Sequence, residues 1–224
     1  MLNKKVASFL ILVVFFNSCS SLPDNVASNF KLAATSIKSA VFGFEDYPIT
    51  RDLVESIPYA SMRLKIGKGP AGLMILESQS KDSNTWLSSD EVSITEKNGF
   101  IIRTSGLLNN VINLRFIGQK DVPNLLNYRN EKDLKSYLTL HNPEVFELEL
   151  ELNIVNKGVE KVIIVDKEYS LVHFIIGKEN KYIRWKANDH FWIDPIDGYV
   201  WKSIQNIAPN IPQVLIEVTK KPAI

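Results

Sequence analysis

The sequence predicts an all-β domain, mainly an antiparallel meander that forms a barrel-like or curled sheet, with an N-terminal amphipathic helix. From Glu144 to Asn156, apolar and polar residues alternate almost strictly, which is typical of a strand with one buried face. Further short strand-like segments are separated by Asn, Gly and Pro residues that favour turns. The 45% hydrophobic and 10% aromatic content is that of an ordinary globular domain. Many neighbouring hairpins indicate a barrel, a half-barrel or a curled sheet.

The chain begins with a basic segment and an apolar run from Val6 to Phe16, followed by Asn17, Ser18 and Cys19. This order is typical of a secretory signal, and the run is shorter than the roughly 20 residues that span a bilayer. A cysteine directly after a small residue, in a chain with one cysteine, resembles the bacterial lipobox. The resemblance implies that residues 1–18 are a lipoprotein signal peptide and that Cys19 carries acyl chains. The alternative is a plain signal peptide with an incidental cysteine.

Acylation of Cys19 would supply the two or more chains that stable membrane anchoring requires. Residues 19–24 would then be an acylated tether and residues 25–224 a single, mostly β domain. No disulfide is expected, since the chain has no second cysteine. Ser20 stands where Asp would be the familiar inner-membrane retention signal. The lipobox resemblance therefore favours the periplasmic face of the outer membrane.

The charge of the mature chain excludes one class of partner. Removing Lys4 and Lys5 from the 26 Lys and Arg residues leaves 24, against 25 Asp and Glu residues. The charges are interspersed, whereas a nucleic-acid-binding protein needs a basic face. We therefore expect no nucleic-acid partner.

Two helices are expected before the first strand. Apolar residues between Asn25 and Phe42 recur near the helical period, and Gly43 follows them. This amphipathic helix would pack on the domain or lie on lipid, and its few basic residues favour packing. Thr50 is placed to cap a short helix that follows it.

The remaining elements are mostly strands. They are expected at residues 59–66, 72–79, 92–97, 100–105, 144–156, 159–165, 169–176, 182–187, 191–194, 199–207 and 213–219. Turns are expected at Gly67–Pro70, Lys97–Gly99 and Asn156–Gly158. Trp86 is assigned to a polar linker, residues 107–116 fit helix or strand, and a short helix is expected over 131–137.

Residues 182–203 form the densest aromatic segment of the chain. Asp194 can bond its own backbone, and Gly198 can take a left-handed conformation, which together predict a four-residue turn. If Asp194 pairs with Tyr199, Trp192 faces Trp201. The indole pair would then be core packing or a flat platform for sugar rings. The candidate surface for a glycan or a protein partner consists of Arg184, Trp185, Trp192, Asp194, Tyr199 and Trp201.

This aromatic segment resembles one protein family. Arg184-Trp185-Lys186 and Trp192-Ile193-Asp194-Pro195-x-x-Gly198-Tyr199-Val200-Trp201-Lys202-Ser203 are similar to the YjbF family of lipoproteins. Ile57–Met62 with Gly67-x-Gly69-Pro70, and Gly99-x-x-x-Arg103-Thr104-x-Gly106-Leu107, match as well. The resemblance runs from Cys19 to about Thr219, without residues 121–141. It implies a mostly β, outer-membrane-associated lipoprotein encoded with partners of exopolysaccharide or capsule secretion, and it brings no catalytic residue.

The residues themselves do not indicate an enzyme. Asp189, Asp194 and Asp197 are the best carboxylate group, but turn chemistry already explains the last two. The histidines at positions 141, 173 and 190 stand far apart in the sequence, without a second ligand at metal spacing. A Gly-x-Ser-x-Gly motif is absent. We therefore expect no catalytic residue, no metal and no other cofactor.

Together, these observations predict a non-catalytic accessory of exopolysaccharide or capsule secretion. Its expected partners are the membrane, through acyl chains on Cys19, and envelope secretion proteins, with the polysaccharide itself as a further candidate. An alternative is a carrier for lipid or another apolar ligand, like the half-barrel lipoprotein chaperones of the outer membrane. The volume of the interior distinguishes the two, because a carrier needs a large apolar cavity.

Overall fold

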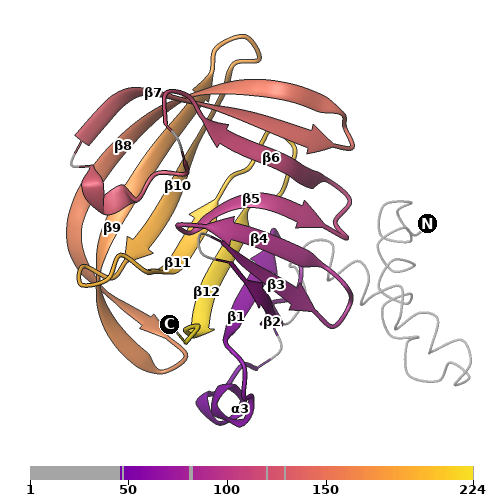
Figure 1. The fold of residues 1–224 in the computed structure, drawn as a ribbon, viewed down its shortest axis with the longest axis vertical. Helices are drawn as coiled ribbons and strands as arrows, with labels where there is room; N and C mark the ends of the chain where they lie inside the picture. The colour runs from indigo at the N-terminus through magenta and orange to yellow at the C-terminus, as the bar shows by residue number, and fades with distance from the viewer. Residues whose placement is uncertain (1–45, 47, 81–82, 120, 129, 224) are drawn as a thin grey trace, which may run out of the picture. The chain divides into compact units, whose positions relative to one another are not determined.

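The computed structural model describes residues 46–223 except 47, 81–82, 120 and 129 (Figure 1). The described residues form twelve strands, the short helix α3 (Arg51–Ser56) and the 3-10 turn η1 (Leu125–Asn127). This confirms the all-β fold class. The signal peptide, Cys19 and the helix expected over residues 25–42 lie outside the described residues.

The strands are short in the first half of the chain and longer in the second. Their bounds are β1 Ser61–Ile66, β2 Gly72–Gln79, β3 Asn84–Ser88, β4 Ser93–Lys97, β5 Phe100–Ser105, β6 Asn110–Phe116, β7 Asn130–His141, β8 Val145–Ile164, β9 Lys167–Asn180, β10 Trp185–Ile193, β11 Val200–Gln205 and β12 Val214–Lys220.

All twelve strands belong to one antiparallel sheet, in the order β5-β4-β3-β2-β1-β12-β11-β10-β9-β8-β7-β6. Consecutive strands pair as the meander predicts, except β5 and β6, and one further pairing joins β1 to β12. Because the first and last strands pair at the centre of the sheet, its two edges, β5 and β6, are neighbours in the sequence. The sheet curls until these edges lie side by side, which makes it a nearly closed barrel (Figure 1).

Side chains close the seam between β5 and β6. The backbone N–H of Val111 donates to Thr104 Oγ1 at 2.9 Å near the connecting loop. At the other end of the seam, the Phe100 and Phe116 rings are 5.2 Å apart between centroids and meet edge to face. Phe100 also contacts Phe191 of β10, with 4.6 Å between the ring centroids. The seam therefore depends on packing rather than on a backbone ladder.

Two apolar clusters stabilise the sheet. The larger one fills the interior and includes the fully buried rings of Trp86, Phe174 and Phe191. The smaller one packs Val162, Ile164 and Leu171 of the β8–β9 hairpin against Trp192 of β10. Each fully buried side chain of this size contributes about 1.5–3 kcal/mol through burial.

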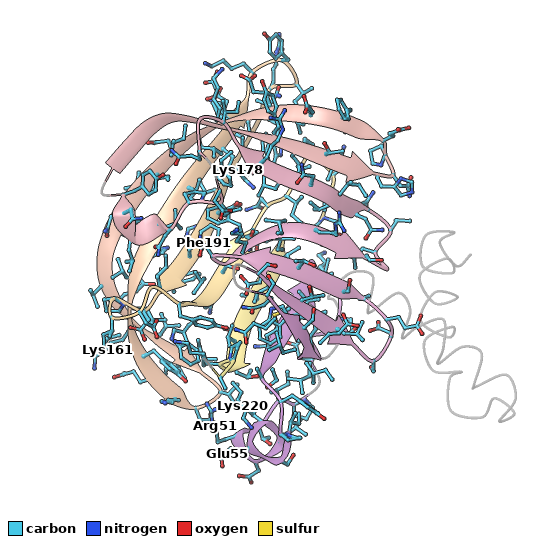
Figure 2. All side chains as sticks on the ribbon, in the orientation of Figure 1. Arg51, Glu55, Lys161, Lys178, Phe191 and Lys220 are labelled. Carbon is cyan, nitrogen blue, oxygen red and sulfur yellow. The ribbon has the colours of Figure 1, made fainter. Side chains whose placement is uncertain are left out.

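Helix α3 ties the tip of the β8–β9 hairpin to β12. Thr50 Oγ1 caps the helix by accepting from Leu53 N at 3.3 Å, as predicted. The Arg51 guanidinium donates to the carbonyls of Ile164, at 3.0 Å, and Thr219, at 3.3 Å. Figure 2 shows Arg51 on α3 close to Lys220 at the end of β12. Neither helix in the described part of the chain has the length and apolarity that a membrane crossing requires.

Four predicted elements were wrong. Trp86 lies in β3 and is fully buried, and the expected helix at 131–137 is part of β7. Residues 156–158 form a bulge within β8 rather than a turn, because Asn156 Oδ1 accepts from Gly158 N at 2.8 Å and the strand continues. The two strands expected at 182–187 and 191–194 are one strand, β10 (Trp185–Ile193), and residues 182–184 lie in the β9–β10 turn before it.

Candidate functional site

A polar pocket of about 320 Å³ opens where the β2–β3, β4–β5 and β10–β11 turns converge. The turns of a meander alternate between its two ends, so these three turns share one end. The loop before η1 and the segment after β12 complete the wall. The side chains that matter below come from these segments and are Gln79, Asn84, Glu96, Asn98, Asp121, Asn124, Asp197, Tyr199 and Lys221.

The β4–β5 turn forms one wall through Asn98 and Gly99, whose φ angles are 48° and 79°. A Cβ on Gly99 would lie 2.6 Å from Val200 Cγ2, so only glycine lets the turn pack this closely on β11. Gln205 fixes the contact, because its Nε2 donates to the Gly99 carbonyl at 2.8 Å and its Oε1 accepts from Ile101 N at 3.1 Å. These bonds bring two sequence-distant walls of the pocket together.

The β10–β11 turn has the predicted geometry. Asp194 N donates to the Tyr199 carbonyl at 2.9 Å, and Asp194 Oδ1 accepts from Ile196 N at 2.9 Å. Gly198 has a φ of 75°, and Ile193 pairs with Val200. A Cβ on Gly198 would lie 3.1 Å from Asn124 Nδ2, so the turn packs on the loop before η1. Asp197 and Tyr199 thus face the pocket while Asp194 holds the turn.

Glu96 accepts hydrogen bonds through both of its carboxylate oxygens. Its Oε1 accepts from Asn84 Nδ2 at 2.7 Å, and its Oε2 accepts from Gly99 N at 2.9 Å. Burial raises the pKa of Glu96, although both hydrogen bonds oppose the shift. No lysine or arginine pairs with Glu96 in the described part of the chain. The carboxyl is therefore held by neutral donors.

The other two carboxylates of the pocket each face a lysine. Asp121 pairs with Lys97, whose hydrogen bond lowers the pKa of Asp121. Asp197 pairs with Lys221 after β12 and accepts from Tyr199 N at 2.9 Å. Burial would raise the pKa of Asp197, but the bonds from Lys221 and Tyr199 outweigh it, so the pKa is lowered.

Tyr199 lines the pocket, and its buried hydroxyl makes no hydrogen bond to the described residues. Burial, together with the charges of Glu96 and Asp197, raises the pKa of the Tyr199 phenol well above its ordinary value. Lys221 Nζ lies 4.6 Å from the centroid of the ring and covers it.

The pocket is built for binding by hydrogen bonds. Its wall offers carboxylate and amide oxygens as acceptors and ammonium and amide groups as donors. All three carboxylates already accept at least one hydrogen bond from the protein. These bonds fix the orientation of the carboxylates, whose remaining lone pairs can accept hydrogen bonds from a ligand.

Trp192 and Trp201 are not a cross-strand pair. A bulge after Trp192 pairs it with Lys202, so the predicted facing of the two indoles was wrong. Trp192 is buried, stacks on His173 with 4.6 Å between centroids, and donates from Nε1 to Glu160. The half-buried Trp201 packs against Tyr169, with 4.5 Å between the ring centroids. In this structure the two rings join packed clusters rather than an open platform.

The remaining predicted surface residues lie at the two ends of β10. Arg184 is exposed in the β9–β10 turn and Trp185 is half-buried at the start of β10. Asp194 and Tyr199 lie at the opposite end, in the β10–β11 turn. Of the six candidates, Tyr199 lines the pocket.

Two titratable clusters correct the sequence analysis. Asp189 is not near Asp197: it is buried and pairs with Lys178 at 2.7 Å, inside the sheet. His173 and His190 are far apart in the sequence but their Nε2 and Nδ1 atoms are 3.0 Å apart, because β9 and β10 pair. Within the described residues, no group of three His, Cys, Asp or Glu side chains is arranged to hold a metal ion.

The interior bears on the carrier alternative. A cavity lined by Phe100, Leu150, Lys178 and other residues of the inner face measures about 30 Å³. Ligand pockets usually measure about 300–1,000 Å³, so this cavity is too small for an acyl chain. Aromatic and aliphatic side chains fill the space that a carrier would keep open. This observation counts against the carrier function.

Sequence reasoning missed Glu96, Asn124 and Lys221. The Asn98-Gly99 and Asp194–Gly198 turns were both recognised from their residues. Their meeting in one pocket depends on the closure of the sheet through the pairing of β1 with β12. No local pattern encodes that pairing, although the even number of strands between the turns would have given their common end.

Comparisons with known proteins find similarity over most of the described chain. A family model described as group 4 capsule polysaccharide lipoprotein gfcB, YjbF, matches residues 34–219. The uncharacterized lipoprotein GfcB of Escherichia coli (strain K12) is 22% identical over 116 residues. The match covers 52% of this chain and spans about half, 51%, of the relative.

A solved structure shares the fold. The crystal structure of the hypothetical lipoprotein YmcC from Escherichia coli (K12) superimposes with a TM-score of 0.70 at 18% identity. The superposition covers 84% of this chain and 96% of that chain. At this identity the likeness supports the barrel-like meander and carries no information on ligands.

Proposed function

The chain belongs to the YjbF family of group 4 capsule polysaccharide lipoproteins, and on that premise we propose that it is a non-catalytic accessory of capsule or exopolysaccharide secretion. In this proposal, acyl chains on Cys19 hold the domain at the periplasmic face of the outer membrane. The domain then presents its surface to the envelope proteins that export the polymer.

The single observation that carries the proposal is the family match over residues 34–219, which supplies the biological process. The structure supports the non-catalytic part. The carboxylates of the pocket are bonded to backbone N–H groups and to lysine or asparagine side chains. A site in which these groups are already engaged is suited to binding a partner or ligand.

The partners follow from the same considerations. A nearly neutral chain with interspersed charges has no basic face for nucleic acid. Secretion proteins of the envelope are the proposed protein partners. The polysaccharide is the proposed ligand of the polar pocket. The β10–β11 turn is the surface proposed for the protein partners, because the edges of β5 and β6 lie against each other.

Deletion of the gene tests the proposal. We expect less polysaccharide on the cell surface with unchanged cytoplasmic synthesis, measured by polymer-specific staining of intact cells and of lysates. Expression of the wild-type chain from a plasmid should restore the surface polymer. Unaltered surface polymer in the deletion strain, or cleavage of the polymer by purified protein, would contradict the proposal.

A further inference from the structure

We infer that the polar pocket binds an uncharged sugar residue of the exported polysaccharide, with Asp197 and Glu96 as acceptors for its hydroxyl groups. This inference rests on the proposed function, because it names the ligand of the site described above. It is carried by the shape, the hydrogen-bonding groups and the charge of the pocket.

The pocket has the size and accessibility of a small-molecule site. Its volume of about 320 Å³ is ten times that of the interior cavity. Pockets for small ligands begin at about 300 Å³. Its walls come from turns and from the segment after β12, so a residue within a polymer can enter without crossing the sheet.

The pocket offers both kinds of hydrogen-bonding group that a sugar hydroxyl uses. A hydroxyl donates one hydrogen bond and accepts others. Asp197 uses one oxygen for Tyr199 N and the other for Lys221, and a carboxylate has about four lone-pair sites, so acceptor capacity remains. The Asp197 side chain is 39% exposed and is therefore accessible.

Amide groups supply the complementary donors. Asn124 Oδ1 accepts from Leu126 N at 3.0 Å, which orients the side chain and leaves its Nδ2 without a hydrogen bond to the described residues. Gln79, at the end of β2, also lines the pocket and makes no side-chain hydrogen bond to the described residues. Donors and acceptors thus surround the space, which suits a ligand with several hydroxyls.

The charge of the pocket favours an uncharged sugar over an acidic one. Lys97 and Lys221 are matched by Asp121 and Asp197. Glu96 has no cationic partner in the described part of the chain, so the described residues that line the pocket carry no excess positive charge. A uronate or a phosphorylated sugar would place its anion beside these carboxylates, which is unfavourable.

Two substitutions in the same turn test the inference. Asp197→Asn keeps the oxygen that accepts from Tyr199 N but removes the charge and half of the acceptor capacity. Asp194→Asn, the matched control, keeps the bond to Ile196 N and lies outside the pocket lining. Both variants should fold, which circular dichroism and the melting temperature check, and Glu96→Gln provides a second pocket variant.

The ligand is supplied as fragments of the surface polysaccharide of the producing cells. The polymer is hydrolysed to short oligosaccharides and separated by anion exchange into a neutral and an acidic pool. Calorimetric titration of the full acylated chain in detergent should show binding of the neutral pool. Asp197→Asn and Glu96→Gln should weaken this binding about 10-fold or more, as expected for hydrogen bonds to a charged group. Asp194→Asn should leave it unchanged.

Three results would overturn the inference: no binding of the neutral pool, binding of the acidic pool alone, or equal affinity of the wild type and the Asp197→Asn variant. The deletion experiment is independent of these binding results. Loss of surface polymer in the deletion strain without sugar binding would leave the secretion role in place and remove the sugar site. Sugar binding without a deletion phenotype would leave the sugar site in place and remove the secretion role.

Discussion

At the residue scale, Trp192 shows how a side chain that suggests a ligand platform can serve packing. One face of its indole stacks on His173, and Lys202 Nζ lies 5.3 Å from its ring. Its Nε1 donates to Glu160 of β8. The residue therefore joins three strands on the outer face of the sheet, and its loss should affect folding more than recognition.

Trp192→Ala is expected to lower the free energy of unfolding by about 3–5 kcal/mol, because it removes a buried indole and leaves a cavity. Urea denaturation followed by circular dichroism measures the change. Tyr182→Ala is the control, since this ring is 95% exposed and should alter stability little. Unchanged stability together with lost polymer binding would instead identify Trp192 as a glycan platform.

His173 gives a prediction about pH. Burial lowers its pKa, as do the neighbouring His190 and Lys157, while Glu160 raises it and the net shift is downward. The unfolded state therefore binds a proton at a higher pH than the folded state does. Stability is present above the unfolded pKa of about 6.5 and is lost as the pH falls through the folded value.

We expect the melting temperature of the wild type to fall between pH 7.5 and pH 5, and His173→Gln to reduce that fall because its side chain does not titrate. His141→Gln, in an exposed position at the end of β7, should behave like the wild type. Differential scanning calorimetry at both pH values gives the comparison. An identical pH dependence in the wild type and His173→Gln would refute it.

At the element scale, periodicity identified most strands because their buried and exposed faces alternate. It misassigned residues where the pairing partner decides the outcome. The stretch 131–137 has no clear period, yet it forms part of β7 because β8 pairs with it and β6 pairs with its last residues, Ser136 and Tyr137. Trp86 in β3 was placed in a linker because its neighbours are polar, although β2 and β4 enclose it.

The β8 bulge gives a test of local backbone conformation. Gly158 has a φ of 87°, and a Cβ there would meet nothing within 4 Å. Gly158→Ala should therefore destabilise the fold by about 1–2 kcal/mol through backbone strain alone. Gly72→Ala in β2 is the matched control, since its Cβ would also meet nothing and its φ is not positive. Equal stability of the two variants, measured by urea denaturation, would show that the bulge tolerates a side chain.

At the scale of the whole molecule, the sequence indicated a curled or barrel-like sheet but not how it closes. Closure follows from the pairing of β1 with β12, which are separated by almost the entire described chain. The pocket depends on it, because β12 carries Lys221 to the turn that holds Asp197. The two turns were predictable from Asn98-Gly99 and Asp194–Gly198, whereas their meeting required this long-range pairing.

Anchoring at the membrane is the remaining prediction at this scale, and it rests on the residues around Cys19. Acyl chains contribute about 0.8 kcal/mol per buried methylene, so two or more chains hold a protein on a membrane where one does not. Cys19→Ser removes the thiol that would be acylated. The variant is expected in the soluble periplasmic fraction, while the wild type sediments with membranes.

Ser20→Asp tests the membrane at which the protein is held. Asp directly after the acylated cysteine would act as an inner-membrane retention signal, so this variant should stay membrane-bound but move from the outer to the inner membrane. Fractionation on a sucrose gradient with immunoblotting separates the two membranes, and mass spectrometry of the N-terminal peptide reports the acyl chains.

A free Cys19 thiol on the mature wild-type chain, or equal membrane association of the wild type and Cys19→Ser, would disprove lipid anchoring. The domain would then need a protein partner to hold it at the secretion site.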